Sequence, residues 1–285
     1  MSYFTILGCE REPFSTSPDP RFFYESQQHK AALVNVLIEL RLRRGLSVVL
    51  GDVGVGKTTL GRKLVQQLKE RPGFDVHMIL DPSYPSEESF LAALIRTFQI
   101  GIETPTPGVV ELKASLERFL YRQGVEEGRT TVLVIDEAQK LNAVSLEVLR
   151  SLLNFETNEV KLLQLVLLAQ LELMPLLAGA PNVLDRISWS AVLQPLTPQE
   201  THELIEFRLR EAGYRGWQRL FTDEAIAEIH RTTQGSPRRI SWLCHHALRT
   251  LVAVQGERIE RELILELLHR GAGWPLPQLL GERAR

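Results

Sequence analysis

Short apolar runs alternate with longer stretches of helical spacing as far as Pro195. Five such runs predict strands, at residues 47–50, 75–80, 131–135, 163–169 and 191–193. The segments between them repeat apolar residues at three- and four-residue intervals, which predicts helices at 27–44, 59–70, 86–98, 109–123 and 144–155. Because strands and helices alternate, the pattern predicts an α/β fold with a parallel five-stranded sheet between helices.

The pattern changes after Pro195. Helical spacing continues at 198–212, 222–233, 237–253 and 258–270, and no strand pattern lies between these segments. We therefore predict an α/β domain over 27–195 and a small all-helical domain over 196–270. Residues 1–26 are rich in proline and aromatic residues, which favours an ordered arm packing on the core. Residues 271–285 carry glycine, proline and charge, and are predicted to form a loose tail.

The composition indicates an ordinary globular protein. The chain has 285 residues, of which 44% are hydrophobic and 24% charged. Its 33 lysines and arginines against 35 acidic residues give a formal net charge of -2, which offers no global attraction to nucleic acid. The N-terminus lacks the pattern of a signal peptide, and no stretch approaches the roughly 18 apolar residues of a membrane span. The sequence thus predicts a soluble, cytoplasmic protein without a membrane span.

One glycine-rich stretch joins the first predicted strand to the next helix. It reads Gly51-Asp52-Val53-Gly54-Val55-Gly56-Lys57-Thr58, followed by Thr59, and fits the P-loop pattern G-x-x-x-x-G-K-[ST]. The glycines let several backbone N–H groups converge on one point, where the following helix presents its positive dipole end. Lys57 is then placed to reach the β- and γ-phosphates, and the Thr58 hydroxyl to bind Mg²⁺. The stretch predicts a site for ATP with Mg²⁺; the alternative is a chance glycine-rich turn.

Polar residues follow two of the predicted strands. Asp136 and Glu137 come directly after 131–135, at the edge of the sheet where ligands bind in open α/β folds. Asp136 is the predicted Mg²⁺ ligand and Glu137 the group that polarises the attacking water; the alternative is a solvated acidic turn. Gln170 follows 163–169 and is a candidate contact for the γ-phosphate or for that water, with an ordinary surface amide as the alternative.

Arginines elsewhere are candidates for further phosphate contacts. Arg186 precedes the last predicted strand and could reach the γ-phosphate of a neighbouring subunit as an arginine finger. The alternative is a surface arginine paired with Asp185 or another carboxylate. Arg238 opens a helix of the second domain and is predicted to touch the phosphates if that domain folds over the nucleotide; the alternative is a surface arginine in an ordinary ion pair. Arg239 is expected to face solvent or a partner.

Together these residues resemble the AAA+ ATPases of the ExeA-like type, the general secretion pathway protein A family. The resemblance covers residues 1–255. The residues that carry it are Gly8, Pro13-Phe14, Pro18-Asp19-Pro20, Phe22, Tyr24 and His29, the P-loop, Asp136-Glu137-Ala138-Gln139, Arg186-Ile187, Leu196-Thr197 and Gly235-Ser236-Pro237-Arg238-Arg239-Ile240. The resemblance implies a P-loop AAA+ domain with a helical lid, ATP bound at a subunit interface, assembly into a ring or filament, and an arginine finger in trans.

Two departures limit what the resemblance implies. The family commonly has Gly-Gln-Pro-Glu where this chain has Ala169-Gln170-Leu171-Glu172, so the turn after Gln170 is expected to differ. Secretion members typically continue into a transmembrane helix and a peptidoglycan-binding module, neither of which follows in this sequence. Related AAA+ ATPases without that extension include transposition regulators of the TniB/TnsC type, which bind ATP, polymerise on DNA and recruit a transposase.

Two hypotheses of function follow, beside a third, a nucleotide-locked scaffold with little turnover, against which the presence of Glu137 argues. The first is an ATP-hydrolysing AAA+ protein that forms a homo-oligomer, binds ATP at subunit interfaces, and remodels or loads a protein partner such as a secretion or pilus component. The second is an ATP-dependent regulator of DNA transposition that polymerises on duplex DNA and recruits a transposase. The basic residues that could serve the second are Arg41, Arg43, Arg44, Lys113, Arg118 and Arg122, for which solvated helix faces are the alternative.

Overall fold

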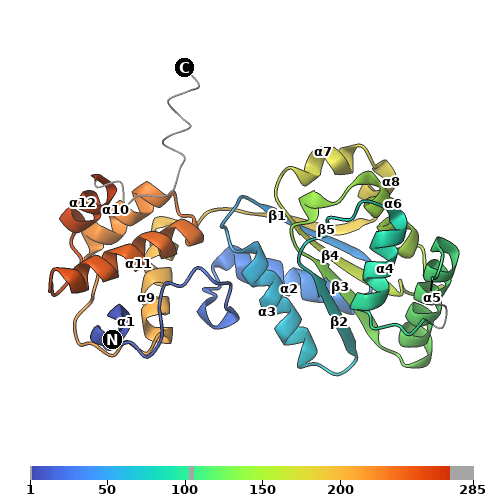
Figure 1. The fold of residues 1–285 in the computed structure, drawn as a ribbon, viewed down its shortest axis with the longest axis horizontal. Helices are drawn as coiled ribbons and strands as arrows, with labels where there is room; N and C mark the ends of the chain where they lie inside the picture. The colour runs from blue at the N-terminus through green and yellow to red at the C-terminus, as the bar shows by residue number, and fades with distance from the viewer. Residues whose placement is uncertain (1, 103–105, 270–285) are drawn as a thin grey trace, which may run out of the picture. The chain divides into compact units, whose positions relative to one another are not determined.

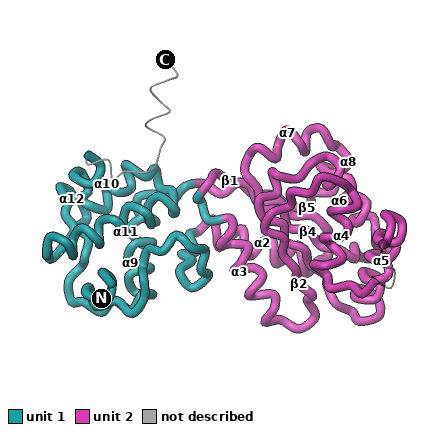
Figure 2. Tube along the Cα trace, viewed as in Figure 1, with its two compact units in different colours: residues 1–26, 54–56, 195–285 teal, residues 27–53, 57–194 magenta. Residues whose placement is uncertain are grey.

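The computed structural model describes residues 2–102 and 106–269 (Figure 1). The predicted tail over 271–285 lies outside the described residues, as does residue 270 at the end of the last predicted helix. Contacts divide the chain into two compact units (Figure 2). Unit 1 comprises Met1–Ser26, Gly54–Gly56 and Pro195–Arg285, and unit 2 comprises Gln27–Val53 and Lys57–Gln194.

Unit 2 is built on a sheet of five parallel strands in the order β2-β3-β4-β1-β5, which confirms the predicted sheet (Figure 1). The strands are β1 (Leu46–Gly51), β2 (Phe74–Ile79), β3 (Thr130–Ile135), β4 (Leu163–Ala169) and β5 (Ile187–Leu193). Every residue of β1, β3 and β4 is buried, as expected for inner strands of a parallel sheet. Parallel pairing places the carboxyl ends of these three strands at the same end of the sheet. The P-loop, Asp136 and Gln170 follow the strands at this end.

The edge strand β5 is longer than the strand predicted at 191–193. Its side chains alternate between half-buried and exposed positions until the last residue, because successive side chains point to opposite faces of the sheet and only one face of this edge strand is covered. Ser188 and Ser190 are exposed and interrupt the apolar run. A search for continuous apolar runs therefore finds only the end of this strand.

The longer helices of unit 2 follow the predicted segments, with differences of a few residues at their ends. They are α2 (Gln27–Arg41), α3 (Lys57–Lys69), α4 (Glu87–Thr97), α5 (Val109–Tyr121) and α6 (Ala143–Leu152). The sequence pattern does not predict two short helices, α7 (Leu173–Ala178) and α8 (Pro181–Leu184). They are too short to display a helical repeat, and α7 contains Pro175, which argues against a helix in a sequence reading.

Unit 1 contains the four helices predicted after Pro195. They are α9 (Pro198–Glu211), α10 (Asp223–Thr233), α11 (Pro237–Ala253) and α12 (Arg261–His269). Gly235, two residues before α11, packs closely against Leu196. Its φ is +70°, and an added Cβ would lie 2.1 Å from the Leu196 carbonyl oxygen. Among the helices of residues 2–102 and 106–269, none has both the length and the apolar character that crossing a bilayer requires.

The N-terminal arm lies in unit 1, with a short helix α1 (Tyr3–Ile6) at its start. Phe14 is 1% exposed, and its ring meets that of Phe221 edge to face, with 6.0 Å between centroids. Arg208 of α9 donates to the Ser15 carbonyl at 3.1 Å. The sequence pattern predicts an arm that packs on the core without naming a domain, and Phe14 belongs to the apolar cluster of the helical unit. An aromatic segment signals burial but does not indicate which of two domains buries it.

Candidate nucleotide-binding site

The P-loop follows β1 and ends where α3 begins, at Lys57. Gly54 and Gly56 have φ angles of 83° and 106°, in the left-handed region that glycine adopts without strain. A Cβ added at Gly54 would lie 2.8 Å from the Cβ of Arg238, so this position has no room for a side chain. The segment is therefore a tight turn with bare backbone at a helix N-terminus, which is the arrangement that binds phosphate groups.

Lys57 is nearly buried, with 6% of its surface exposed. Its Nζ donates to the carbonyl oxygens of Gly51 and Asp52, at 2.7 and 2.8 Å. Burial lowers the pKa of Lys57, and the carboxylates of Glu137 and Asp136 oppose that shift. Because an ammonium group has three protons, the two carbonyls leave one donor for an anionic ligand. The Lys57 side chain thus fits the phosphate contact expected of it.

Asp136 lies directly after β3 and is 2% exposed. Burial raises the pKa of its carboxyl group, whereas hydrogen bonds from the Thr58 hydroxyl and the Glu137 N–H lower it. The structure therefore brings together Thr58 and Asp136, the two predicted Mg²⁺ ligands. A hydroxyl and a carboxylate are the hard oxygen donors that suit Mg²⁺, so the residues present fit this ion.

Glu137 has a left-handed backbone, with φ 53° and ψ 36°. Such a conformation costs a non-glycine residue on the order of 1 kcal/mol, and here it turns the chain from β3 into the short 3-10 turn Ala138–Lys140. The half-buried carboxylate accepts a hydrogen bond on Oε2 from Nε2 of Gln139, at 2.6 Å. The negative charge of Glu137 opposes the lowering of the Lys57 pKa by burial, so this carboxylate acts electrostatically on the P-loop lysine.

Gln170 lies beside Glu137, because β4 pairs with β3 and both strands end at the same edge. Its Nε2 is 3.5 Å from Glu137 Oε2, and its backbone N–H donates to Oε1 of Gln139 at 3.0 Å. The candidate residues of β3 and β4 are thus in contact. Gln139 belongs to the same group, yet the sequence reading gives it no role. Its signals in the sequence are its place two residues after Glu137 and its membership of the Asp136-Glu137-Ala138-Gln139 motif that carries the family resemblance.

Arg186 does not join the site of its own chain. It precedes β5, so the parallel sheet places it at the edge opposite to that of Lys57 and Glu137. Its guanidinium donates to the Asn182 carbonyl and to Oδ1 of Asn154. These hydrogen-bond acceptors are neutral, rather than the carboxylate that the surface-pair interpretation expects.

Arg238 lies at the start of α11, in unit 1. Its backbone N–H donates to the Gly54 carbonyl at 3.2 Å, a contact inside that unit. The tip of the P-loop and the N-terminus of α11 are therefore neighbours within unit 1. Arg239, the next residue, is exposed.

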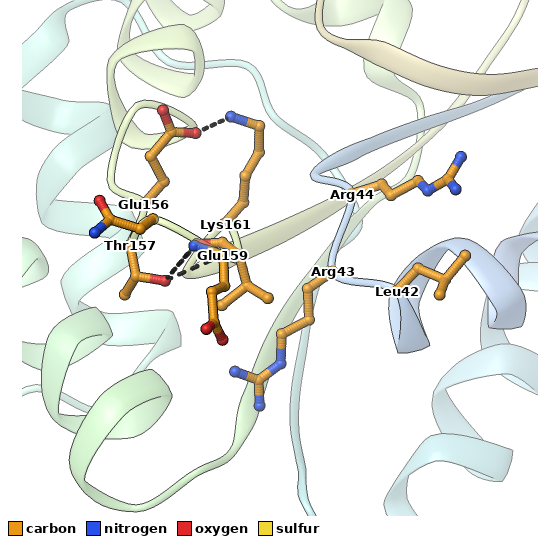
Figure 3. A pocket seen from close by; sticks show the side chains of 9 residues that line it. Leu42, Arg43, Arg44, Glu156, Thr157, Glu159 and Lys161 are labelled. Atoms are coloured by element: carbon orange, nitrogen blue, oxygen red, sulfur yellow. Dashed lines mark hydrogen bonds and ion pairs between the residues drawn. The ribbon is translucent and has the colours of Figure 1, made fainter.

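A separate hollow of about 590 Å³ lies where the Leu42–Arg44 turn faces the loop before β4 (Figure 3). Arg43 donates to Thr130 Oγ1 at 2.9 Å and to the Gly128 carbonyl at 3.0 Å. Lys161 pairs with Glu156 on the other side. This hollow is at the amino ends of β1 and β4, away from the P-loop, and these two cations already have partners within the chain. It is therefore not the candidate site.

The basic residues of α5 and its end also have partners within the chain. Lys113 pairs with Glu87 at 2.6 Å, Arg118 donates to Ser115 Oγ at 3.2 Å, and Arg122 lies 3.7 Å from Glu127. Together with the bonds of Arg43, these contacts favour the solvated, internally paired interpretation for four of the six basic residues named as candidates for DNA.

Fold and site define an AAA+ P-loop nucleotide-binding protein. Residues 40–177 match the family model described as "AAA domain". This span contains the P-loop and the polar residues that follow β3 and β4.

Among known proteins, the chain is similar to General secretion pathway protein A of Aeromonas hydrophila, with 36% identity over 248 residues. The match covers 86% of this chain and 44% of that relative, so the chain spans less than half of the relative's length. The resemblance to the ExeA-like AAA+ ATPases is thereby confirmed.

Two solved structures share the fold. The Aeropyrum pernix ORC2 protein in ADPNP-ADP complexes has a TM-score of 0.66 and 17% identity, over 92% of this chain and 71% of that one. The Aeropyrum pernix ORC1 protein in complex with DNA has a TM-score of 0.64 and 18% identity, over 91% and 69%. At these identities the likeness concerns the fold alone.

Proposed function

We propose that this chain is an ATPase that binds Mg-ATP at the P-loop, hydrolyses it, and assembles into a homo-oligomer with ATP at subunit interfaces. The observation that carries the proposal is the meeting of Lys57, Asp136 and Glu137 at one edge of the sheet. A protein that binds ATP without hydrolysing it would need only the P-loop. The additional half-buried carboxylate, held beside the lysine, supports hydrolysis.

In the proposed mechanism each side chain has one task. The P-loop N–H groups and Lys57 hold the β- and γ-phosphates of ATP, and Thr58 and Asp136 hold Mg²⁺. The ion would supply charge neutralisation to the phosphates when bound. Glu137 orients and polarises the attacking water, and Gln170 contacts that water or the γ-phosphate. These roles suit phosphoryl transfer, in which catalysis consists mainly of positioning and electrostatic stabilisation.

Two arginines complete the proposed site. We assign Arg238 to the phosphates of its own chain, because its backbone already contacts Gly54. We assign Arg186 to the γ-phosphate held by a neighbouring subunit, because it lies at the sheet edge opposite to its own P-loop. Such a contact joins unlike surfaces of two copies, which gives a ring if the rotation closes and a filament if it does not.

The partner is proposed from the relative's name. Because the Aeromonas hydrophila relative is a general secretion pathway protein, we propose that the oligomer remodels or loads a protein assembly of the secretion or pilus kind. The alternative is a transposition regulator that polymerises on duplex DNA and recruits a transposase. The internal pairing of Arg43, Lys113 and Arg122 favours the first.

The hydrolytic assignment is tested by Glu137→Gln. The variant should bind ATP with unchanged affinity and lose turnover by roughly two orders of magnitude or more, because the amide cannot accept the proton of water. Steady-state phosphate release and titration with a fluorescent ATP analogue measure the two quantities. Glu70→Gln, which changes an exposed carboxylate beyond the end of α3, is the control and should behave as wild type. Wild-type turnover in Glu137→Gln would remove Glu137 from this role.

A measurement of assembly distinguishes the secretion- or pilus-type function from the transposition alternative. Light scattering should show ATP-dependent growth in particle size that duplex DNA leaves unchanged. DNA-stimulated growth that weakens as salt rises would instead support the transposition alternative, since phosphate contacts release counterions.

A further inference from the structure

The Gln139 side chain links two strand ends at the candidate site. Its Nε2 lies 2.6 Å from Glu137 Oε2, and its Oε1 lies 3.0 Å from the backbone nitrogen of Gln170. Glu137 follows β3 and Gln170 follows β4, so one amide spans the adjacent ends of two paired strands. We propose that Gln139 is a positioning residue that holds the Glu137 carboxylate in the orientation required to activate water. This inference rests on the proposed ATPase function.

The direction of both hydrogen bonds is fixed by chemistry. A backbone N–H can only donate, so the atom of Gln139 that faces Gln170 must be the amide oxygen. The amide nitrogen then faces Glu137 and donates to it. A carboxylate can only accept, so this second bond agrees with the first. The bridge therefore has one arrangement that satisfies both of its ends, and the amide cannot flip without placing two acceptors against each other.

The position of Glu137 makes such a hold necessary. Its backbone is left-handed, and its side chain is half-buried rather than packed in the core. A glutamate side chain has several rotatable bonds, so the backbone alone does not fix the carboxylate. Gln170 Nε2, at 3.5 Å, is a weak second donor to the same oxygen. The shorter bond from Gln139 is the contact that sets the orientation, and the other carboxylate oxygen stays available for water.

The neighbours of Gln139 on the turn have different tasks. Ala138 is buried in the apolar core of unit 2. Lys140 is exposed, and its Nζ donates a hydrogen bond to Asp81 Oδ2 at 3.1 Å. Gln139 alone of the three residues in this turn contacts both Glu137 and Gln170. A substitution at Lys140 is therefore the matched control for damage to the turn itself.

The experiment uses the full chain with two substitutions at one position. Gln139→Met keeps the length of the side chain and removes both bonds. Gln139→Glu keeps an acceptor for the Gln170 N–H but places a second carboxylate against Glu137. Both should lower kcat for ATP hydrolysis by roughly 10- to 100-fold, the scale expected when a general base is misplaced by about 1 Å. The Kd for a fluorescent ATP analogue should change by less than about threefold, since Gln139 is not among the groups assigned to the phosphates. Lys140→Met should match wild type in both.

A double-mutant cycle tests whether Gln139 acts through Glu137. In the Glu137→Gln background, Gln139→Met should lower the residual single-turnover rate no further, because the group that it positions is already gone. A general loosening of the fold would lower the rate in both backgrounds. Additive losses therefore overturn the inference, as does near-wild-type kcat in both Gln139 variants. The proposed function fails in a different way: an absence of ATP-dependent phosphate release from the wild-type chain would reject it, whereas additive losses in the cycle reject only the role of Gln139.

Discussion

Two glycines with similar backbone conformations show how surroundings decide the cost of a side chain. Gly54 has φ +83° and Gly73 has φ +89°, so an alanine is strained at either position. An added Cβ meets no atom within 4 Å at Gly73, but at Gly54 it meets Arg238 Cβ at 2.8 Å and Ser236 Oγ at 3.0 Å. The φ angles are similar and the available space is not.

We predict that Gly54→Ala lowers the thermal midpoint further than Gly73→Ala does. Gly73→Ala should cost about 1 kcal/mol from the φ angle alone, whereas Gly54→Ala adds the forced separation of Arg238 from the P-loop. Differential scanning fluorimetry measures the midpoints, and ATP titration should show weakened binding only for Gly54→Ala. Equal shifts in the two variants would mean that Arg238 does not pack against the P-loop.

At the scale of elements, the N-terminal arm is part of the helical unit. Phe14 is 1% exposed and contacts Phe221, while Ile6, in α1 of the same arm, is 57% exposed. We predict that Phe14→Ala lowers the free energy of unfolding by about 3–4 kcal/mol, because it leaves a cavity in a closed apolar cluster. Ile6→Ala, the control, should change it by less than about 0.5 kcal/mol. Denaturant unfolding followed by circular dichroism measures both, and equal effects would contradict the burial of the arm.

A buried carboxylate joins α10 to α12. Glu228 is 3% exposed and accepts hydrogen bonds from Arg231 Nε at 3.0 Å and Arg261 Nε at 3.2 Å. The pKa of Glu228 is lowered. The hydrogen bond from Arg231 lowers it most and the bond from Arg261 lowers it further, while burial raises it. Because both arginines are more than half exposed to water, the gain is limited.

We predict that Glu228→Gln lowers stability by about 1–2 kcal/mol at pH 7. A carboxyl group whose folded pKa lies below its unfolded value stabilises the protein above the unfolded pKa, near 4.3 for glutamate, and this contribution disappears as pH falls through the folded pKa. The difference in the free energy of unfolding between wild type and variant should thus be constant from pH 7 to about 5.5 and become smaller below about pH 4.3. Denaturant unfolding at each pH measures it, with Glu224→Gln, at an exposed position of α10, as control. A gap that widens in acid would contradict the sign of the shift.

At the scale of the whole molecule, the site is proposed to need a second chain. Arg186 is held by Asn182 and Asn154 at the sheet edge opposite to Lys57. A side chain there can act on ATP only if a neighbouring copy brings its own P-loop to that edge. The proposed finger role of Arg186 therefore requires the proposed oligomer.

We predict that two inactive variants restore activity when mixed. Glu137→Gln lacks the base and Arg186→Ala lacks the finger. In a random 1:1 assembly about a quarter of interfaces pair an intact base with an intact finger from the neighbour. Phosphate release should recover toward that fraction, while each variant alone stays near background. No recovery, in mixtures shown by light scattering to assemble, would place Arg186 outside the site.

Much of the candidate site is predictable because its chemistry is local in sequence. The P-loop glycines, Lys57 and Thr58 lie within eight consecutive residues, and Asp136 and Glu137 follow an apolar run that is typical of an inner strand. Gln139 is harder to identify. Its role depends on the distance to Gln170, thirty-one positions away, and that contact exists because β3 and β4 are neighbours in the sheet.

The sequence by itself determined the alternation of strands and helices, the change to an all-helical part after Pro195, and the residues that would hold a nucleotide. These follow from periodicity and from motifs whose members are close along the chain. The tertiary structure alone decided the strand order, the extent of β5, the unit that buries the arm, and the bridge from Gln139 to Glu137 and Gln170. Each of these depends on contacts between segments far apart in sequence, and a local pattern records that a face is apolar or polar without recording what lies against it.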